Sequence, residues 1–197
     1  MAASIRLFAV AVAGALLLAG CDKDDDELPA TTGGSPSTQT EPVGGTDAMV
    51  GASTVPVAVP ATNAETALLA DVRVARHEGF DRVVLEFRNL LPGYDVRYVD
   101  PPVYQDGSGA EVRVEGAAVV RVRLESALDA DLTQESAPRS YTGPNRFSPR
   151  TPEVVELARA GGFEGVLTWV VGLGDRVDFR VLTLEDPPRL VLDFRHH

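Results

Sequence analysis

The sequence has few of the residue types that most often build catalytic and metal sites. Its 197 residues include one cysteine, one tryptophan and three histidines. One thiol excludes a disulfide framework within the chain. His196 and His197 end the chain, where fraying is expected, and a single internal histidine, His77, is too little for a zinc site with three or four ligands. Gly172-Leu173-Gly174 is too short for a phosphate loop. We therefore expect neither a metal ion nor an organic cofactor.

Clustered positive charge is also lacking. The formal net charge is −11, and residues 69–197 contain sixteen arginines, no lysine and twenty-one carboxylates. The arginines are interspersed with acids and form no basic block. Because nucleic-acid binding depends on a concentrated basic patch that neutralises phosphates, we expect no nucleic-acid partner.

No apolar run reaches the roughly 20 residues that a membrane-spanning helix needs. The most apolar segment is Phe8–Ala19 (FAVAVAGALLLA), which follows a short segment with one basic residue, Arg6. A basic start followed by an apolar stretch of this length is typical of a secretory signal. We therefore expect the chain to be exported.

Leu18-Ala19-Gly20-Cys21, at the end of this apolar stretch, resembles the lipobox of bacterial prolipoproteins. The resemblance implies cleavage before Cys21, a diacylglycerol on its thiol and an acyl chain on the new terminal amine. Two or more chains give stable anchoring, since each buried CH₂ contributes about 0.8 kcal/mol. Lipidation also accounts for the odd cysteine, whereas an ordinary signal peptide with a chance cysteine is the alternative. We expect residues 1–20 to be removed and Cys21 to hold the chain on the extracytoplasmic face of the cell membrane.

Residues 21–68 have the composition of a linker. The segment opens with an acidic run (DKDDDE) and continues through Pro, Thr, Gly and Ser, with too few apolar residues to offset the entropy of ordering. Val55–Ala61 is more apolar, but its two prolines favour an extended connector. We expect a disordered acidic tether over residues 21–68 and one folded domain over 69–197.

The domain consists of short segments rich in Val, Leu, Phe and Tyr, several of which alternate apolar with charged residues. Arg121 and Arg123, for example, alternate with apolar neighbours, which is the period of a half-buried strand. Turn residues such as Leu91-Pro92-Gly93 separate the segments. The pattern predicts an all-β fold, either a β-sandwich or a barrel. The predicted strands are Asp71–Ala75, Arg82–Phe87, Tyr94–Val99, Val119–Leu124, Val166–Val171, Phe179–Leu184 and Leu190–Phe194.

The segment 152–160 is ambiguous. Thr151-Pro152-Glu153 has the marks of a helix start, and glycines follow the apolar stretch. An internal repeat favours a strand instead, because VARHEGFDRVVLEF (74–87) aligns without a gap with LARAGGFEGVLTWV (157–170). The first copy reads as a hairpin around Gly-Phe-acid, so we expect Val154–Arg159 to be a strand of a second hairpin. A third echo relates Arg82–Phe87 to Arg189–Phe194, and together the repeats predict a pseudo-symmetric sandwich of two sheets.

These motifs carry a family resemblance. The hairpin ARHEGFDRVVLEF, the stretch Gly162–Trp169, the stretch Tyr141–Pro149 (YTGPNRFSP) and the closing DPPRLVLDF resemble the AMIN-like domain of actinobacterial lipoproteins and secreted proteins. That group is related to the AMIN domain of periplasmic amidases and of secretins. The resemblance implies a β-sandwich without catalysis that localises its carrier at the cell envelope by contacting peptidoglycan. No catalytic domain accompanies it in this sequence.

Catalytic patterns are sparse. Ser140 or Ser148 could be combined with His77 and Asp81 into a triad, but no Gly-x-Ser-x-Gly elbow supports it. A pair of carboxylates remains possible for glycoside hydrolysis, and four acids lie in predicted loops: Asp100, Asp106, Asp129 and Asp131. Most such acids only solubilise a protein, so we expect a protein that is not an enzyme.

Binding is the stronger hypothesis. The loop Arg139–Arg150 supplies four candidate ligand contacts, Arg139, Tyr141, Asn145 and Arg146. These residue types are candidates because aromatic rings stack on sugars and arginines pair with the carboxylates of peptidoglycan. Arg82 is a further candidate contact, although it could instead form structural ion pairs. The loop could likewise be an ordinary connection that packs on the edge of the sandwich. We expect the domain to bind a cell-envelope component, with peptidoglycan the leading candidate. An accessory protein that docks on a membrane or envelope complex is the alternative, and a hydrolase is the third.

Overall fold

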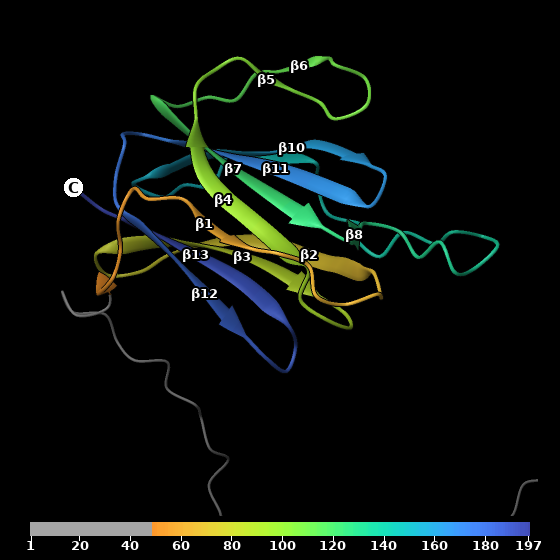
Figure 1. The fold of residues 1–197 in the computed structure, drawn as a ribbon. Helices are drawn as coiled ribbons and strands as arrows, with labels where there is room; N and C mark the ends of the chain where they lie inside the picture. The colour runs from red at the N-terminus through yellow and green to blue at the C-terminus, as the bar shows by residue number, and fades with distance from the viewer. Residues whose placement is uncertain (1–48) are drawn as a thin grey trace, which may run out of the picture. The chain divides into compact units, whose positions relative to one another are not determined.

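A computed structural model describes residues 49–197, and within them the fold is all-β, without an α-helix. Two main sheets lie one above the other, with a small third sheet above the upper one (Figure 1). The six-stranded sheet has the order β1 (Val57–Val59), β4 (Gly93–Val99), β7 (Ala118–Glu125), β11 (Val166–Leu173), β10 (Val154–Phe163) and β9 (Arg146–Phe147). The five-stranded sheet has the order β12 (Phe179–Leu184), β13 (Arg189–Arg195), β3 (Phe80–Phe87), β2 (Ala67–Arg76) and β8 (Ala127–Leu128). The third sheet pairs β5 (Val103–Tyr104) with β6 (Glu111–Val112). The expected two-sheet all-β fold is confirmed, and each of the seven predicted strands lies within an observed one.

The core lies between the two main sheets because each strand turns its apolar residues inward. In β7, Val120, Val122 and Leu124 are buried while Arg121 and Arg123 face outward, as the period of two requires. The largest buried side chains include Trp169 of β11 and several rings from the facing sheet and its connections. Arg121 and Arg123 therefore make the outer face of β7 polar, and this face is part of the site described below.

The ambiguous segment 152–160 forms a strand, since β10 runs from Val154 to Phe163 and pairs antiparallel with β11. The two copies of the repeat are both hairpins, one in each main sheet. Their turns differ in position. The first turn is at Gly79 with a positive φ, whereas the second is the pair Glu164-Gly165, both with positive φ as a type I′ turn needs. The acidic residue that follows Gly-Phe in the repeat is therefore placed differently in the two copies. Asp81 is buried in β3, whereas Glu164 is exposed at the tip of a turn.

Ordered structure begins before the expected boundary at residue 69. Met49 is buried, and Ser53 exchanges two backbone hydrogen bonds with Phe179, at 2.9 and 3.0 Å, on the edge of β12. β1 then pairs with β4 at the edge of the other sheet. The expectation of a linker through residue 68 is therefore wrong for residues 49–68, because this segment gains its order from backbone pairing with sheet edges rather than from apolar composition. Residues 1–48, with Cys21 and the acidic run, lie outside the described part of the chain.

The segment from Pro101 to Val114, which contains β5 and β6, forms a flap over the outer face of the six-stranded sheet (Figure 1). Val103 and Val112 of the flap pack on a small apolar cluster of that face, which includes Ala158, Ala160 and Val170. This second cluster, which also includes Val119 of β7, holds the flap against β10, β11 and the start of β7. In the described part of the chain, no helix is long and apolar enough to cross a membrane.

Candidate functional site: a polar hollow under the flap

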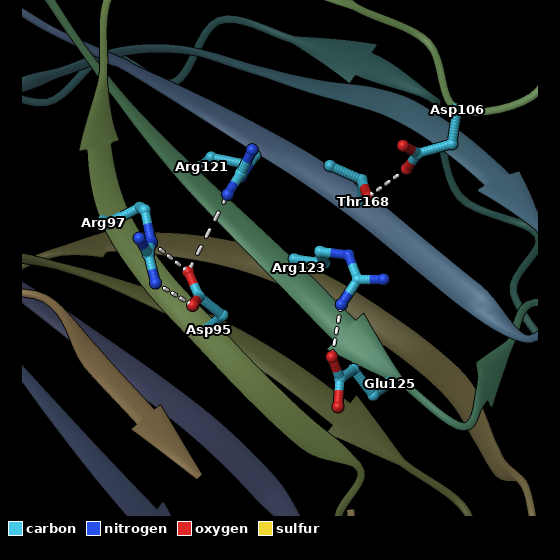
Figure 2. Close-up of polar contacts among 7 residues, drawn as sticks. All are labelled: Asp95, Arg97, Asp106, Arg121, Arg123, Glu125 and Thr168. Atoms are coloured by element: carbon cyan, nitrogen blue, oxygen red, sulfur yellow. Dashed lines mark hydrogen bonds and ion pairs between the residues drawn. The ribbon is translucent and has the colours of Figure 1, made fainter. Parts of the chain in front are cut away.

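The outer face of the six-stranded sheet carries three neighbouring arginines, Arg97 on β4 with Arg121 and Arg123 on β7. Arg97 lies directly opposite Arg121 in the antiparallel pairing, and Asp95 lies opposite Arg123. Because side chains two residues apart share a face of a strand, all four point away from the core. Figure 2 shows them side by side on the outer face. We call this set of three arginines the arginine row.

The arginine row lines a hollow of about 550 Å³ between the sheet and the flap. This volume is in the range of small-ligand sites. The flap contributes Asp106 and Tyr104, and Tyr104 is exposed over 57% of its surface. The full lining is Asp95, Arg97, Val99, Asp100, Pro102, Val103, Tyr104, Asp106, Arg121, Arg123 and Thr168. The hollow thus joins cations, anions and one exposed ring.

Two of the three arginines are hydrogen-bonded to carboxylates. Arg97 donates from Nε to Asp95 Oδ1 at 2.6 Å and from Nη2 to Asp95 Oδ2, and these bonds raise the pKa of the Arg97 guanidinium. Arg123 bonds Glu125 through Nη1. Figure 2 shows both pairs together with the longer contact from Arg121 to Asp95. The paired guanidiniums are held in fixed orientations at the mouth of the hollow.

The flap is tied to the sheet by a hydrogen bond across the hollow. The Thr168 hydroxyl of β11 donates to Asp106 Oδ2 at 2.7 Å, as Figure 2 shows. Gly107 at the flap tip has a positive φ and sits against the ring of Phe163, where an added Cβ would come within 3.0 Å. The apolar cluster, the Thr168 bond and this close approach together fix the flap over the hollow.

The arginine row has a cost for folding. Like charges directly opposite each other on neighbouring strands destabilise a sheet, and Arg97 and Arg121 are such a pair. In addition, the Nε of Arg121 is buried without a hydrogen-bond partner among the described residues, which costs about 1–3 kcal/mol. Residues that break local rules in this way gather at functional sites.

The hollow offers hydrogen-bond donors and acceptors in balanced number. Its three arginines and the three acids Asp95, Asp100 and Asp106 balance in charge. Guanidiniums donate and carboxylates accept, so together they match the hydroxyls and amides of a saccharide. The exposed ring of Tyr104 offers an apolar surface for a sugar face.

The loop residues expected to bind lie elsewhere and have internal partners. Arg139 pairs with Asp129 at 3.1 Å, and Arg146 pairs with Glu156 at 2.7 Å and donates to the Arg113 carbonyl. The carbonyl of Asn145 accepts a backbone hydrogen bond from β10. Asn145 and Arg146 therefore fasten the loop onto β10, and Arg139 ties it to Asp129, next to β8.

Tyr141 and Arg82, the other two expected contacts, are also built into the fold. Tyr141 is buried, its ring meets Trp169 edge-on at 5.7 Å, and its hydroxyl donates to the Pro144 carbonyl at 2.7 Å. Burial raises the pKa of its phenol. Arg82 donates to both oxygens of Asp193 on the neighbouring strand, at 2.7 and 3.1 Å. None of the five expected contacts lines the hollow.

The residues considered for catalysis are not assembled into a triad. Asp81 accepts bonds from the backbone N–H groups of Glu153 and Val154, at 2.6 and 2.9 Å, and contacts His196 Nε2 at 2.7 Å. His77 instead stacks on the ring of Phe80. The expectation of fraying is wrong for His196, whose backbone and ring are both tied to the β2–β3 hairpin. Within residues 49–197, no group of three or more His, Cys, Asp or Glu side chains is placed to hold a metal ion.

Of the four acids in predicted loops, three have bonding partners. Asp106 bonds Thr168, Asp129 joins Arg139 and Arg159, and Asp131 accepts bonds from Thr133 and Gln134, which lower the pKa of its carboxyl. The sequence pattern identified Arg121 and Arg123 as outward-facing residues of β7. It did not indicate that residues of β4 and of the flap lie next to them in the same hollow.

The family model for the AMIN-like domain matches residues 67–196. The match covers β2 to β13 and includes the arginine row and the flap. No curated protein and no solved structure matches the chain.

Proposed function

We propose that this chain, which belongs to the AMIN-like domain family over residues 67–196, is a peptidoglycan-binding protein without catalytic activity. The family suggests binding at the cell envelope. The hollow under the flap is the proposed binding site. The single observation that carries this proposal is the combination of the arginine row, its acids and the exposed Tyr104 in one hollow of saccharide size.

The proposed contact is with the glycan. A sugar ring stacks on Tyr104, while its hydroxyl and acetamido groups take hydrogen bonds from Arg97 and Arg123 and donate to Asp100. Arg97 and Arg123 keep their orientation through Asp95 and Glu125. Preorganised donors of this kind lose little side-chain entropy when a ligand binds.

The proposal includes the membrane anchor. Cleavage before Cys21 and lipidation of its thiol would leave the acidic segment after Cys21 as the spacer between membrane and domain. The protein would then be an extracytoplasmic lipoprotein that reaches the wall while held on the membrane. Labelling with a radioactive fatty acid tests this step, and a Cys21→Ser variant that still takes up label would contradict it.

One observation favours the second candidate, docking on an envelope protein complex. Leu132 is an exposed apolar residue beside a separate hollow of about 700 Å³, which Leu68 and Leu128 also line. Three leucines gathered at one hollow are more typical of a protein contact than of a glycan contact.

Co-sedimentation of the full chain with purified peptidoglycan tests the proposed function and separates the two candidates. Tyr104→Ala should reduce the bound fraction, by about five-fold in affinity if stacking contributes about 1 kcal/mol. Leu132→Ala serves as the matched control, since it removes an exposed apolar residue away from the proposed site. The proposal fails if the chain sediments no more than an unrelated acidic protein, or if Leu132→Ala reduces binding and Tyr104→Ala does not.

A further inference from the structure

We infer that Arg121 reads a carboxylate on the bound saccharide, so that the site prefers an acidic sugar to a neutral one of the same size. The inference rests on the proposed function and names the ligand group that the hollow selects. Its basis is the position of Arg121 in the arginine row, where it lacks a hydrogen-bonded carboxylate.

Among residues 49–197, the only ion pair of Arg121 is a long one. Its Nη2 lies 4.0 Å from Asp95 Oδ1, which is beyond hydrogen-bond range. Both oxygens of Asp95 already accept bonds from Arg97. In Figure 2 the dashed line from Arg121 to Asp95 is visibly the longest in the group. Asp95 is therefore hydrogen-bonded to Arg97 and not to Arg121.

The neighbours of Arg121 in the sheet supply no other acid. Its cross-strand partners are Arg97 on β4 and Val170 on β11. Two further acids are engaged: Glu125 bonds Arg123, and Asp106 bonds Thr168. Asp100 also lines the hollow, but it forms no ion pair with Arg121 among the described residues. Arg121 thus keeps its charge in a partly enclosed hollow, with 35% of its side chain exposed.

A carboxylate would complete this arrangement. The planar guanidinium can donate two parallel bonds to a carboxylate, which suits Arg better than Lys. The bound anion would also lie between Arg97 and Arg121 and relieve their repulsion. Because Asp100 and Asp106 balance the charge of the hollow, a free anion gains little, and the carboxylate must be delivered on a sugar that also contacts Tyr104.

Two disaccharides isolate the carboxylate. N-acetylglucosaminyl-N-acetylmuramic acid carries a lactyl carboxylate, and N,N′-diacetylchitobiose, written chitobiose below, is the same disaccharide without the lactyl group. Titration of the full chain, followed by NMR, should give at least about ten-fold tighter binding of the acidic disaccharide, as expected for a charge-assisted bidentate contact. Acetate at the same concentration should not compete with it.

Arg121→Gln should reduce this preference to about one, because it removes the guanidinium that contacts the carboxylate. Arg121→Lys, which keeps the charge and loses the planar fork, should retain only part of the preference. Arg76→Gln is the matched control, because Arg76 is an exposed arginine of β2 on the other sheet. The preference measured for the unmodified chain tests the inference even if an Arg121 variant does not fold.

The outcomes distinguish this inference from the proposed function. Equal binding of both disaccharides, unchanged by Arg121→Gln, overturns the inference and leaves the proposed function standing. Displacement of the acidic disaccharide by acetate overturns it as well, since the site would then be a general anion site. If neither disaccharide nor insoluble peptidoglycan binds, the proposed function and the inference fail together.

Discussion

Replacing Asp193 by alanine should cost the domain a large part of its stability. Asp193 on β13 is fully buried and accepts four hydrogen bonds, two each from Arg82 on β3 and Arg180 on β12, at 2.7 to 3.1 Å. The side chains of the two arginines are only 14% and 19% exposed, so water cannot replace the lost carboxylate well. Removing one partner of a buried charged network costs about 3–5 kcal/mol. Since a domain of this size is stable by about 5–15 kcal/mol, the loss should be plain in a denaturant titration.

Urea unfolding followed by the fluorescence of Trp169, which is buried in the core, measures this loss. Asp71→Ala is the control, because its partner Arg73 and Asp71 itself are about half exposed, at 43% and 50%. An exposed pair of this kind contributes about 1 kcal/mol or less. If Asp193→Ala lowered the free energy of unfolding no more than Asp71→Ala, the argument that burial makes the first network indispensable would be refuted.

Three further predictions concern the flap, the sheet and the core. Thr168→Val removes the hydroxyl that bonds Asp106, so backbone amides of the flap should exchange hydrogen faster while global stability falls by about 1 kcal/mol; unchanged exchange would contradict this. Gly172→Ala places a Cβ where the Glu115 carbonyl lies, so it should destabilise by at least about 1–3 kcal/mol in a urea titration. Burial raises the pKa of Tyr141 above its usual 10.0, so its contribution is complete below pH 10.0 and is lost as pH rises through the folded pKa. Tyr141→Phe should therefore flatten the fall in stability at alkaline pH, and an equally steep fall would refute the assignment.

The long strands could be predicted because their sequence pattern and their burial have the same cause. A strand between a core and solvent needs alternating residues, and β7 has them. β10 shows the harder case. Its start resembles a helix N-terminus, yet Leu157 and Ala158 pair with Val171 and Val170 of β11. The repeat identified this strand because it reports pairing between strands, which local propensity does not.

The short strands and the N-terminal edge could not be predicted from local pattern. β1, β5, β6, β8 and β9 are two or three residues long, too short for any periodicity. Pro56 and Pro60 flank β1 and made the segment read as a connector, although prolines are tolerated beside an edge strand. Such elements form because a neighbouring edge offers unpaired backbone groups, and that information lies in the partner strand.

The binding residues expected from the loop Arg139–Arg150 were selected by chemistry alone, which does not distinguish a free arginine from a satisfied one. Arg146 and Arg121 look alike in sequence. The fold places Glu156 at 2.7 Å from Arg146, whereas Arg121 lies opposite another arginine and keeps a buried Nε without a partner in the described residues. Asp95 offsets the repulsion between Arg97 and Arg121 only in part, since it bonds Arg97 and lies 4.0 Å from Arg121. A carboxylate from outside the chain would complete this compensation, and for this reason we place the proposed site at Arg121 rather than in the arginine-rich loop.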